Sequence, residues 1–260
     1  MLTKISILTS LSLGIFYPLC LLIHSGSPIK HGFHRFHLGF PLVVGGVAVV
    51  YLLFDAVPLT KGVLMLWFLT LTLVTVVYWK REYAPAFVIA IPSLIGLLAL
   101  FMVHFRFLWL TRMPFVSGFF IHILAGLILC ASLHSMMLGH HYLNAKGLPM
   151  KHLGWASTVL WVLLGLRIVW DLYFLFYGKI LYEGDLIALV HFLMKLDGFL
   201  LWIGIFFGTL LPFVALFFVK EILKLKNTQA ATGLLYVVLC SVLMGDLAYK
   251  YYLVKFGVAL

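Results

Sequence analysis

Residues 85–105 read PAFVIAIPSLIGLLALFMVHF, a run that contains no Asp, Glu, Lys or Arg. A helix rises about 1.5 Å per residue, so a run of this length crosses the roughly 30 Å hydrocarbon core of a bilayer. Outward from it in both directions, glycine, proline and charged residues separate further apolar runs. The predicted spans are residues 5–24, 38–54, 61–79, 85–105, 114–141, 153–177, 196–220 and 229–254. We therefore predict an all-α, polytopic helical bundle that forms one transmembrane domain over residues 1–260.

The composition of the whole chain agrees with these spans. Hydrophobic residues make up 64% and charged residues 10% of the 260 residues, against about 45–50% and 25% in soluble domains. This excludes a soluble domain, a nucleic-acid-binding protein and a disordered chain. The net charge of +10 comes mostly from loop lysines and arginines, which contact anionic lipid headgroups. The odd-numbered loops carry more of them, so we place these loops in the cytoplasm and the chain in the bacterial inner membrane.

Two connecting segments carry local signals. Residues 184–195 read GDLIALVHFLMK and have helical periodicity, but they are too few to cross a bilayer. We predict an interfacial helix or an extension of the seventh span. Asn227 and Thr228 are typical of a helix start. Small residues such as Gly139, Thr232 and Gly233 allow close helix packing.

Ionisable side chains inside spans are the most informative residues, because each costs about 2.5–3.5 kcal/mol on insertion scales. Arg167 and Asp171 are four residues apart, so they share a helix face. A buried guanidinium suits a quinone carbonyl, a haem propionate or an anionic substrate. The alternative is a structural ion pair that faces the bundle interior. Asp246 and Lys250 have the same spacing, and we interpret them as a structural ion pair.

A second polar group lies where the seventh span begins. His191 and Lys195 share a face of the predicted helix, and Asp197 follows them. Such a set suits a quinone headgroup or a proton relay. The alternative is an amphipathic segment whose charged ends reach water.

Buried histidines are candidates for binding a cofactor. Haem b requires two axial histidines from facing helices at similar depth. His122 and His134 lie about 18 Å apart along the fifth span and point about 120° apart, so they would not serve two haems stacked along one groove. Hydrogen bonding across the bundle is the alternative for each histidine. The candidate haem ligands are His24, His134 and His141 toward the odd-loop face, and His104 and His122 toward the other face.

The span count, the small extramembrane mass and these buried polar residues resemble the quinone-interacting anchor subunits of the polysulfide-reductase and dimethyl-sulfoxide-reductase type. The resemblance is one of architecture, without a shared motif. It implies a respiratory membrane subunit that binds quinone, with haem b as a second cofactor, and exchanges electrons with a partner. No cysteine pair forms a CxxC motif, so an iron–sulfur or c-type haem group would belong to that partner subunit.

Two interpretations of function are favoured, and a scaffold or assembly factor with structural ion pairs stays open beside them. In the first, the chain is this quinone-binding subunit, and burial alone assigns the quinone site to Arg167, Asp171, His191, Lys195 and Asp197. In the second, it is a proton- or anion-conducting transporter or channel that uses Arg167, Asp171 and the buried histidines. An intramembrane enzyme is disfavoured, because Asp-rich pairs and an HExxH motif are missing from the sequence. We predict no catalytic residue.

Overall fold

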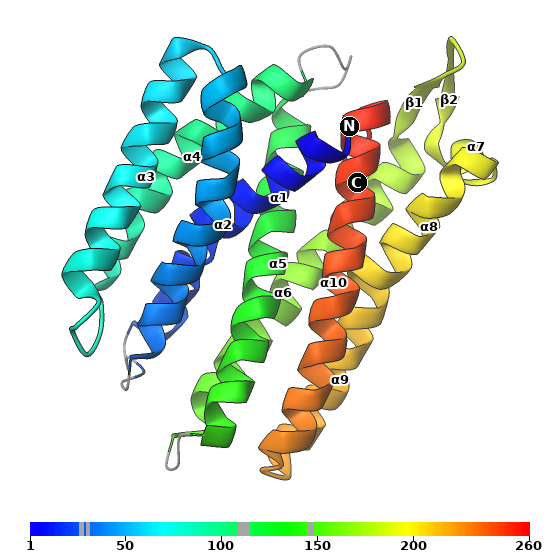
Figure 1. Cartoon of the computed structure of the whole chain (residues 1–260). Helices are drawn as coiled ribbons and strands as arrows, with labels where there is room; N and C mark the ends of the chain where they lie inside the picture. The colour runs from blue at the N-terminus through cyan, green and yellow to red at the C-terminus, as the bar shows by residue number, and fades with distance from the viewer. Residues whose placement is uncertain (26–28, 30–31, 109–114, 145–147) are drawn as a thin grey trace. The chain divides into compact units, whose positions relative to one another are not determined.

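A computed structural model of the chain describes residues 1–25, 29, 32–108, 115–144 and 148–260 (Figure 1). Each predicted span overlaps one helical segment of sufficient length and apolarity, except that residue 114 lies outside the described residues. The all-α polytopic fold is therefore confirmed, and the chain is a multi-pass membrane protein. Within the described residues these eight segments are Leu2–His24, Phe33–Asp55, Pro58–Tyr78, Ala86–Phe107, Val116–Leu143, Lys151–Tyr177, Leu196–Lys224 and Thr228–Phe256.

The chain folds as two compact units. Residues 6–107 form the N-terminal unit, and residues 108–260 with residues 1–5 form the C-terminal unit. The single domain over residues 1–260 stays a prediction.

The core of the N-terminal unit is built around Trp67, which is fully buried. A Cβ on Gly14, Gly45 or Gly96 would approach the indole to 2.9, 2.7 or 2.8 Å, so the ring fills a slot that these glycines leave open. A hydroxyl adds a polar contact, because Ser93 Oγ donates to the Ile15 carbonyl at 2.8 Å. The elements of this unit are η1 (Pro18–His24), α2 (Phe33–Asp55), α3 (Pro58–Tyr78), α1 (Leu2–Phe16) from residue 6 onward and α4 (Ala86–Leu108) up to residue 107.

The C-terminal unit contains α5 (Phe115–Asn144), α6 (Lys151–Tyr177), α9 (Leu211–Lys224) and α10 (Thr228–Phe256), which run side by side (Figure 1). Helix α10 begins as predicted, because Asn227 Oδ1 accepts a hydrogen bond from the Ala230 N–H at 3.0 Å. The predicted close packing at Gly139 is also confirmed, since a Cβ there would lie 2.8 Å from Thr232 Oγ1. Gly233, in contrast, has no neighbour within 4 Å of an added Cβ.

The helix predicted over residues 184–195 is wrong for residues 184–188 and is observed only over Leu189–Leu193. Strands β1 (Lys179–Tyr182) and β2 (Asp185–Ala188) pair in antiparallel fashion, and the short helix α7 (Leu189–Leu193) follows. Glu183 and Gly184 join the strands with φ angles of 53° and 95°. Two consecutive positive φ angles are typical of a type I′ two-residue hairpin turn. We call β1, β2 and α7 the cap; Phe192 of the cap packs in one buried cluster with Leu201 and Tyr252.

The seventh span is not one regular helix. It consists of η2 (Leu196–Gly198), α8 (Phe199–Ile205), the π-helical turn η3 (Phe206–Leu210) and α9. Pro212 has no N–H to offer to the carbonyl of Gly208, four residues earlier, and this loss loosens the helix locally. The π-helical turn follows from that irregularity and changes which side chains face the bundle interior.

Candidate functional site: a buried charge network in the C-terminal unit

Arg167 and Asp171 meet inside the C-terminal unit, as their spacing on α6 predicts. Arg167 Nε donates to Asp171 Oδ1 at 2.9 Å, and the two side chains are only 2% and 5% exposed. The guanidinium uses one edge for this contact. Its Nη2 is buried and has no hydrogen-bond partner among the residues that the structure describes. The pair is therefore not the two-pronged arrangement that binds a carboxylate most firmly.

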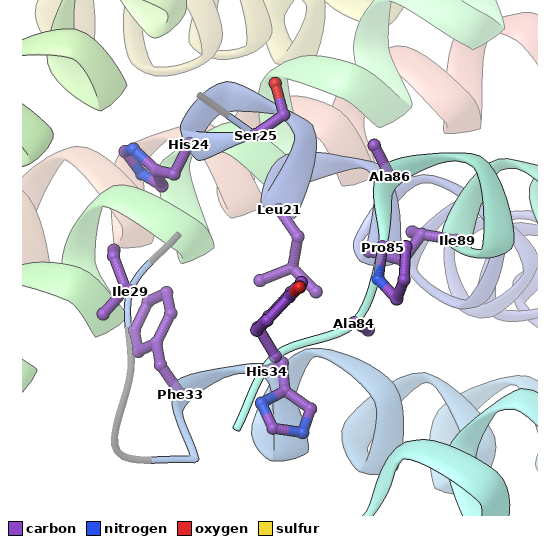
Figure 2. Close-up of a pocket in the computed structure, with 11 residues that line it drawn as sticks. Leu21, His24, Ser25, Ile29, Phe33, His34, Ala84, Pro85, Ala86 and Ile89 are labelled. Carbon is purple, nitrogen blue, oxygen red and sulfur yellow. The ribbon is translucent and has the colours of Figure 1, made fainter. Parts of the chain in front are cut away.

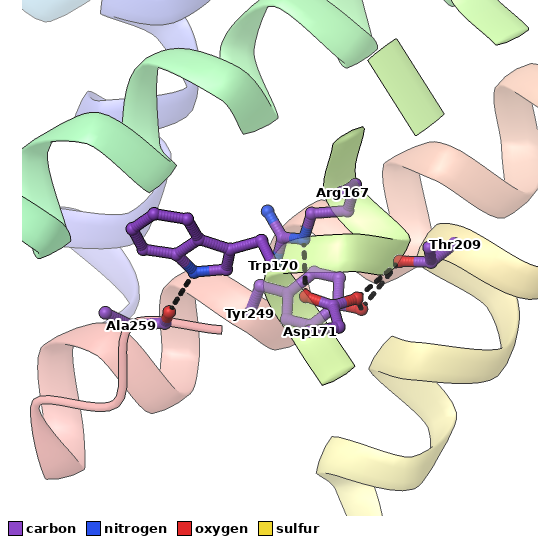
Figure 3. Close-up of polar contacts among 6 residues, drawn as sticks. All are labelled: Arg167, Trp170, Asp171, Thr209, Tyr249 and Ala259. Carbon is purple, nitrogen blue, oxygen red and sulfur yellow. Dashed lines mark hydrogen bonds and ion pairs between the residues drawn. The ribbon is translucent and has the colours of Figure 1, made fainter. Parts of the chain in front are cut away.

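Two hydroxyl groups from other elements complete the surroundings of Asp171 (Figure 3). Thr209 Oγ1 of η3 and the Tyr249 hydroxyl of α10 each lie 3.0 Å from Asp171 Oδ2. The two hydroxyl oxygens are 2.8 Å apart, so the three oxygens form a triangle. The Arg167 guanidinium lies over the Tyr249 ring, 3.8 Å from its centre. Asp171, Thr209 and Tyr249 are called the oxygen triangle below.

The π-helical turn and a glycine contact position these two hydroxyls. Thr209 belongs to the turn itself, so its side chain faces α6 because the helix is locally irregular there. Next to it, a Cβ on Gly245 would lie 2.0 Å from the Gly208 Cα. The two backbones therefore touch, as small residues allow between membrane helices. This contact brings Tyr249, one turn beyond Gly245, up to Asp171.

A second ion pair lies on the same face of α10. Lys250 Nζ and Asp246 Oδ2 are 2.5 Å apart, and both side chains are 3% exposed. The interpretation as an ion pair is confirmed. A cavity of about 10 Å³ adjoins both pairs, which is the size of one water molecule. Its walls are formed by Ala125, Ile128, Arg167, Gly208, Val242, Asp246 and Tyr249.

The other three residues predicted to bind quinone lie apart from Arg167 and Asp171, in exposed positions at the cap. His191 is on α7, whereas Lys195 follows the helix in an extended conformation. The prediction that His191 and Lys195 share a helix face is therefore wrong, since α7 ends at Leu193. Lys195 Nζ lies 4.5 Å from the centre of the Tyr182 ring. The Tyr182 hydroxyl donates to Asp197 Oδ2 at 2.9 Å, and this bond to a carboxylate raises the pKa of Tyr182.

The five candidate haem ligands are divided between the two units. His122, His134 and His141 all lie on α5, so they cannot face one another from two helices. His24 ends the first span and His104 lies near the end of the antiparallel fourth span, which puts them at opposite ends of the N-terminal unit. Each of the five has an interaction partner within the protein. Haem b stays a prediction.

Metal binding finds no support in the described part of the chain. There, no group of three or more His, Cys, Asp and Glu side chains is placed to hold a metal ion. The oxygen triangle has a single carboxylate, and Arg167 occupies one of its oxygens. A cation is therefore disfavoured beside Asp171.

No known protein family, curated protein or solved structure matches this chain. The site is thus defined by its own geometry. Sequence reasoning found both ion pairs but missed Thr209 and Tyr249. Tyr249 lies beside Lys250 in the sequence, and Thr209 lies three residues before a proline. Polar side chains close to a proline or to an intramembrane charge are the signal that would have found them.

Proposed function

We propose that this chain moves protons through the membrane, as a proton channel or a proton-coupled transporter, and that Asp171 binds the proton. The oxygen triangle is the observation that carries the proposal. Its three sides are all of hydrogen-bond length, 2.8 to 3.0 Å. The number of protons available to those sides depends on the protonation state of Asp171.

An ionised Asp171 leaves two hydroxyl protons for three hydrogen-bond distances. Thr209 and Tyr249 then both donate to the carboxylate, and their own oxygens face each other 2.8 Å apart with no proton between them. A protonated Asp171 supplies the third proton. The carboxyl then donates to Thr209, Thr209 donates to Tyr249, and Tyr249 donates back to the carboxyl. The same geometry therefore accepts an added proton without moving an oxygen atom.

Arg167 needs a negative partner when Asp171 is neutral, because an unpaired buried charge is strongly destabilising. Asp246, which also pairs with Lys250, is the second acid available to Arg167, since both residues line the water-sized cavity. A water molecule there can accept from Arg167 Nη2 and donate to the Asp246 carboxylate. The guanidinium thus has one acid on its Nε edge and reaches a second through the cavity.

Two further buried hydroxyls lie nearer the end of the bundle where α6 begins. Ser135 on α5 and Ser157 on α6 are fully buried, and their oxygens lack a hydrogen-bond partner within the described ranges. A buried hydroxyl without a partner is costly, and water is its usual partner in proteins. These two side chains support a path for protons between Asp171 and that end.

Proton flux into liposomes tests the proposal. The full-length chain is reconstituted with an internal pH dye, and a potassium gradient with valinomycin drives proton entry. We expect a wild-type flux that falls at least tenfold in Asp171→Asn and in Thr209→Val. The matched control is Asp55→Asn, which makes the same change at a half-exposed carboxylate of the N-terminal unit. An absent wild-type flux, or an unchanged flux in Asp171→Asn, contradicts the proposal.

A double variant separates loss of function from loss of folding. Asp171→Asn leaves Arg167 buried without its partner, which destabilises by about 3–5 kcal/mol. In Arg167→Met/Asp171→Leu both charges go, and such apolar replacements are often neutral or stabilising. We expect this protein to fold and to carry no protons. Wild-type flux in the double variant would show that the pair only joins helices.

Quinone binding is the second candidate function, in a respiratory membrane subunit that passes electrons to an iron–sulfur or c-type cytochrome partner in the bacterial inner membrane. A pocket of about 70 Å³ in the N-terminal unit favours it (Figure 2). The pocket is lined by apolar side chains such as Leu21, Phe33 and Ile89, with His34 at one side. The cavity beside Arg167 is smaller, about 10 Å³.

His34 gives this pocket a defined hydrogen-bonding character. Its Nε2 lies 2.9 Å from the Tyr78 carbonyl oxygen, which only accepts, so Nε2 is the donor. Its Nδ1 is therefore an acceptor, and it is buried with no partner in the described part of the chain. A hydroquinone hydroxyl at the edge of a ring would donate to Nδ1. Quinone extraction from the purified protein and a redox difference spectrum test this function. If the protein contains no bound quinone and shows no b-type bands, this function is contradicted.

A further inference from the structure

A wide groove runs between the beginning of α6 and the end of α9, in the C-terminal unit. Its volume is about 610 Å³, far larger than the cavity beside Arg167. Gly154 contributes to its width, since an added Cβ there meets nothing within 4 Å. The other residues that line it are Met150, Lys151, Trp155, Thr158, Lys220, Leu223 and Lys224.

The groove is positively charged. Three lysines line it, Lys151 from α6 and Lys220 and Lys224 from α9. A single carboxylate, Glu221, is recorded next to them within the described residues, and it pairs with Lys224 at 2.6 Å. Lys220 Nζ lies 4.1 Å from the centre of the Trp161 ring. This cation–π contact orients the ammonium group without an acidic partner. Two of the three ammonium groups therefore remain available to an external anion.

The groove lies at the level of lipid headgroups. Lys151 is the first residue of its span and Lys224 the last residue of another. Trp155 is one turn inside the span and 62% exposed, as expected for the aromatic residues that mark the membrane–water interface. The groove thus offers cations at its outer end and apolar surface from Met150, Trp155 and Leu223 beside them.

We propose that this groove binds the headgroup of an anionic phospholipid, with the phosphate at Lys151 and Lys220 and the start of an acyl chain against Trp155. Lysines bind phosphate as point charges, and basic pockets between membrane helices are suited to anionic headgroups. A free phosphate would use the lysines but would leave the apolar wall without a function. The site is separate from the oxygen triangle and does not depend on proton transfer.

Lipid titration of the full-length chain tests the proposal. Native mass spectrometry in detergent gives the dissociation constants for phosphatidylglycerol and phosphatidylcholine. Each lysine near an anionic surface contributes about fivefold in affinity. We therefore expect wild type to prefer phosphatidylglycerol, and Lys151→Gln/Lys220→Gln to lose about 25-fold in affinity for it. The matched control is Lys179→Gln, at an exposed lysine of the cap, which should bind like wild type.

Two further measurements make the outcome decisive. Phosphatidylglycerol with brominated acyl chains should quench wild-type tryptophan fluorescence more than that of Trp155→Phe, and brominated phosphatidylcholine should not discriminate between them. Inorganic phosphate at millimolar concentration should fail to displace the lipid. An unchanged lipid preference in the double lysine variant, or full displacement by phosphate, overturns the proposal. The lysines lie at helix ends and not in the core, so these variants are expected to fold.

Discussion

Gly245→Ala is the sharpest test of how the oxygen triangle is held together. The added methyl carbon would lie 2.0 Å from the Gly208 Cα and 2.5 Å from its backbone nitrogen. Carbon atoms in contact stay about 3.5–4.0 Å apart, so α10 and η3 must separate by roughly 1.5 Å. Both neighbouring atoms belong to the Gly208 backbone and not to a flexible side chain, so a side-chain rotation cannot relieve the strain.

The expected loss of stability follows from this geometry. Forcing a methyl group into a packed site costs about 1–3 kcal/mol. Gly233→Ala is the matched control, because it lies on the same helix and its added Cβ meets nothing within 4 Å. Replacing an unstrained helical glycine by alanine stabilises by about 0.4–1 kcal/mol. The two variants should therefore differ by about 1.5–4 kcal/mol although their chemical change is identical.

Thermal unfolding in detergent, followed by tryptophan fluorescence, measures this difference. One kcal/mol corresponds to about 2–4 °C for a chain of 150–250 residues, so Gly245→Ala should unfold about 2–12 °C below wild type. Its proton flux should also fall, because Tyr249 moves away from Asp171. If Gly245→Ala is as stable as Gly233→Ala and conducts like wild type, the glycine contact does not position Tyr249.

Three further substitutions probe other parts of the molecule. Asp246→Asn leaves the Lys250 ammonium buried without its partner and should cost about 3–5 kcal/mol, whereas Asp55→Asn should cost less than about 1 kcal/mol; denaturant titration compares them. Trp67→Ala empties the glycine-lined slot and should cost about 3–5 kcal/mol in the same titration. Gly184→Ala, at a φ of 95°, should cost about 1–2 kcal/mol and accelerate hydrogen exchange in β1 and β2.

The spans could be predicted because each depends on the local composition of about 20 residues. The apolar run at 85–105 has no competing signal, and Asn227 caps α10 by a contact three residues away. The cap was mispredicted because apolar spacing in residues 184–195 fits a helix as well as a strand. The turn at Glu183 and Gly184 decides between them, and a Glu-Gly pair is a weaker turn signal than Asn-Gly.

The candidate site could be predicted only as far as its contacts are local. Arg167 with Asp171 and Asp246 with Lys250 are contacts four residues apart on one helix, which periodicity shows directly. Thr209 is 38 residues from Asp171, and Tyr249 is 78 residues from it. Those contacts require the rotation of three helices about their axes, which depends on a π-helical turn and on the contact of Gly208 with Gly245. A single sequence does not encode such rotations in any pattern of spacing.

The proposed function explains why two ion pairs lie next to each other in the hydrocarbon region. A bundle held together only by packing needs neither, because apolar side chains in place of a buried pair are often neutral or stabilising. With Asp171 ionised, two cations face two carboxylates and the network is neutral. In the proposed mechanism, Asp246 is the remaining carboxylate when Asp171 takes a proton, and it lines the water-sized cavity together with Arg167. A lysine at position 167 would carry all its donors on one nitrogen and could not present separate edges to the two acids. In the proposed mechanism, proton transfer at Asp171 therefore depends on the second pair, and Arg167 is the residue that connects the two pairs.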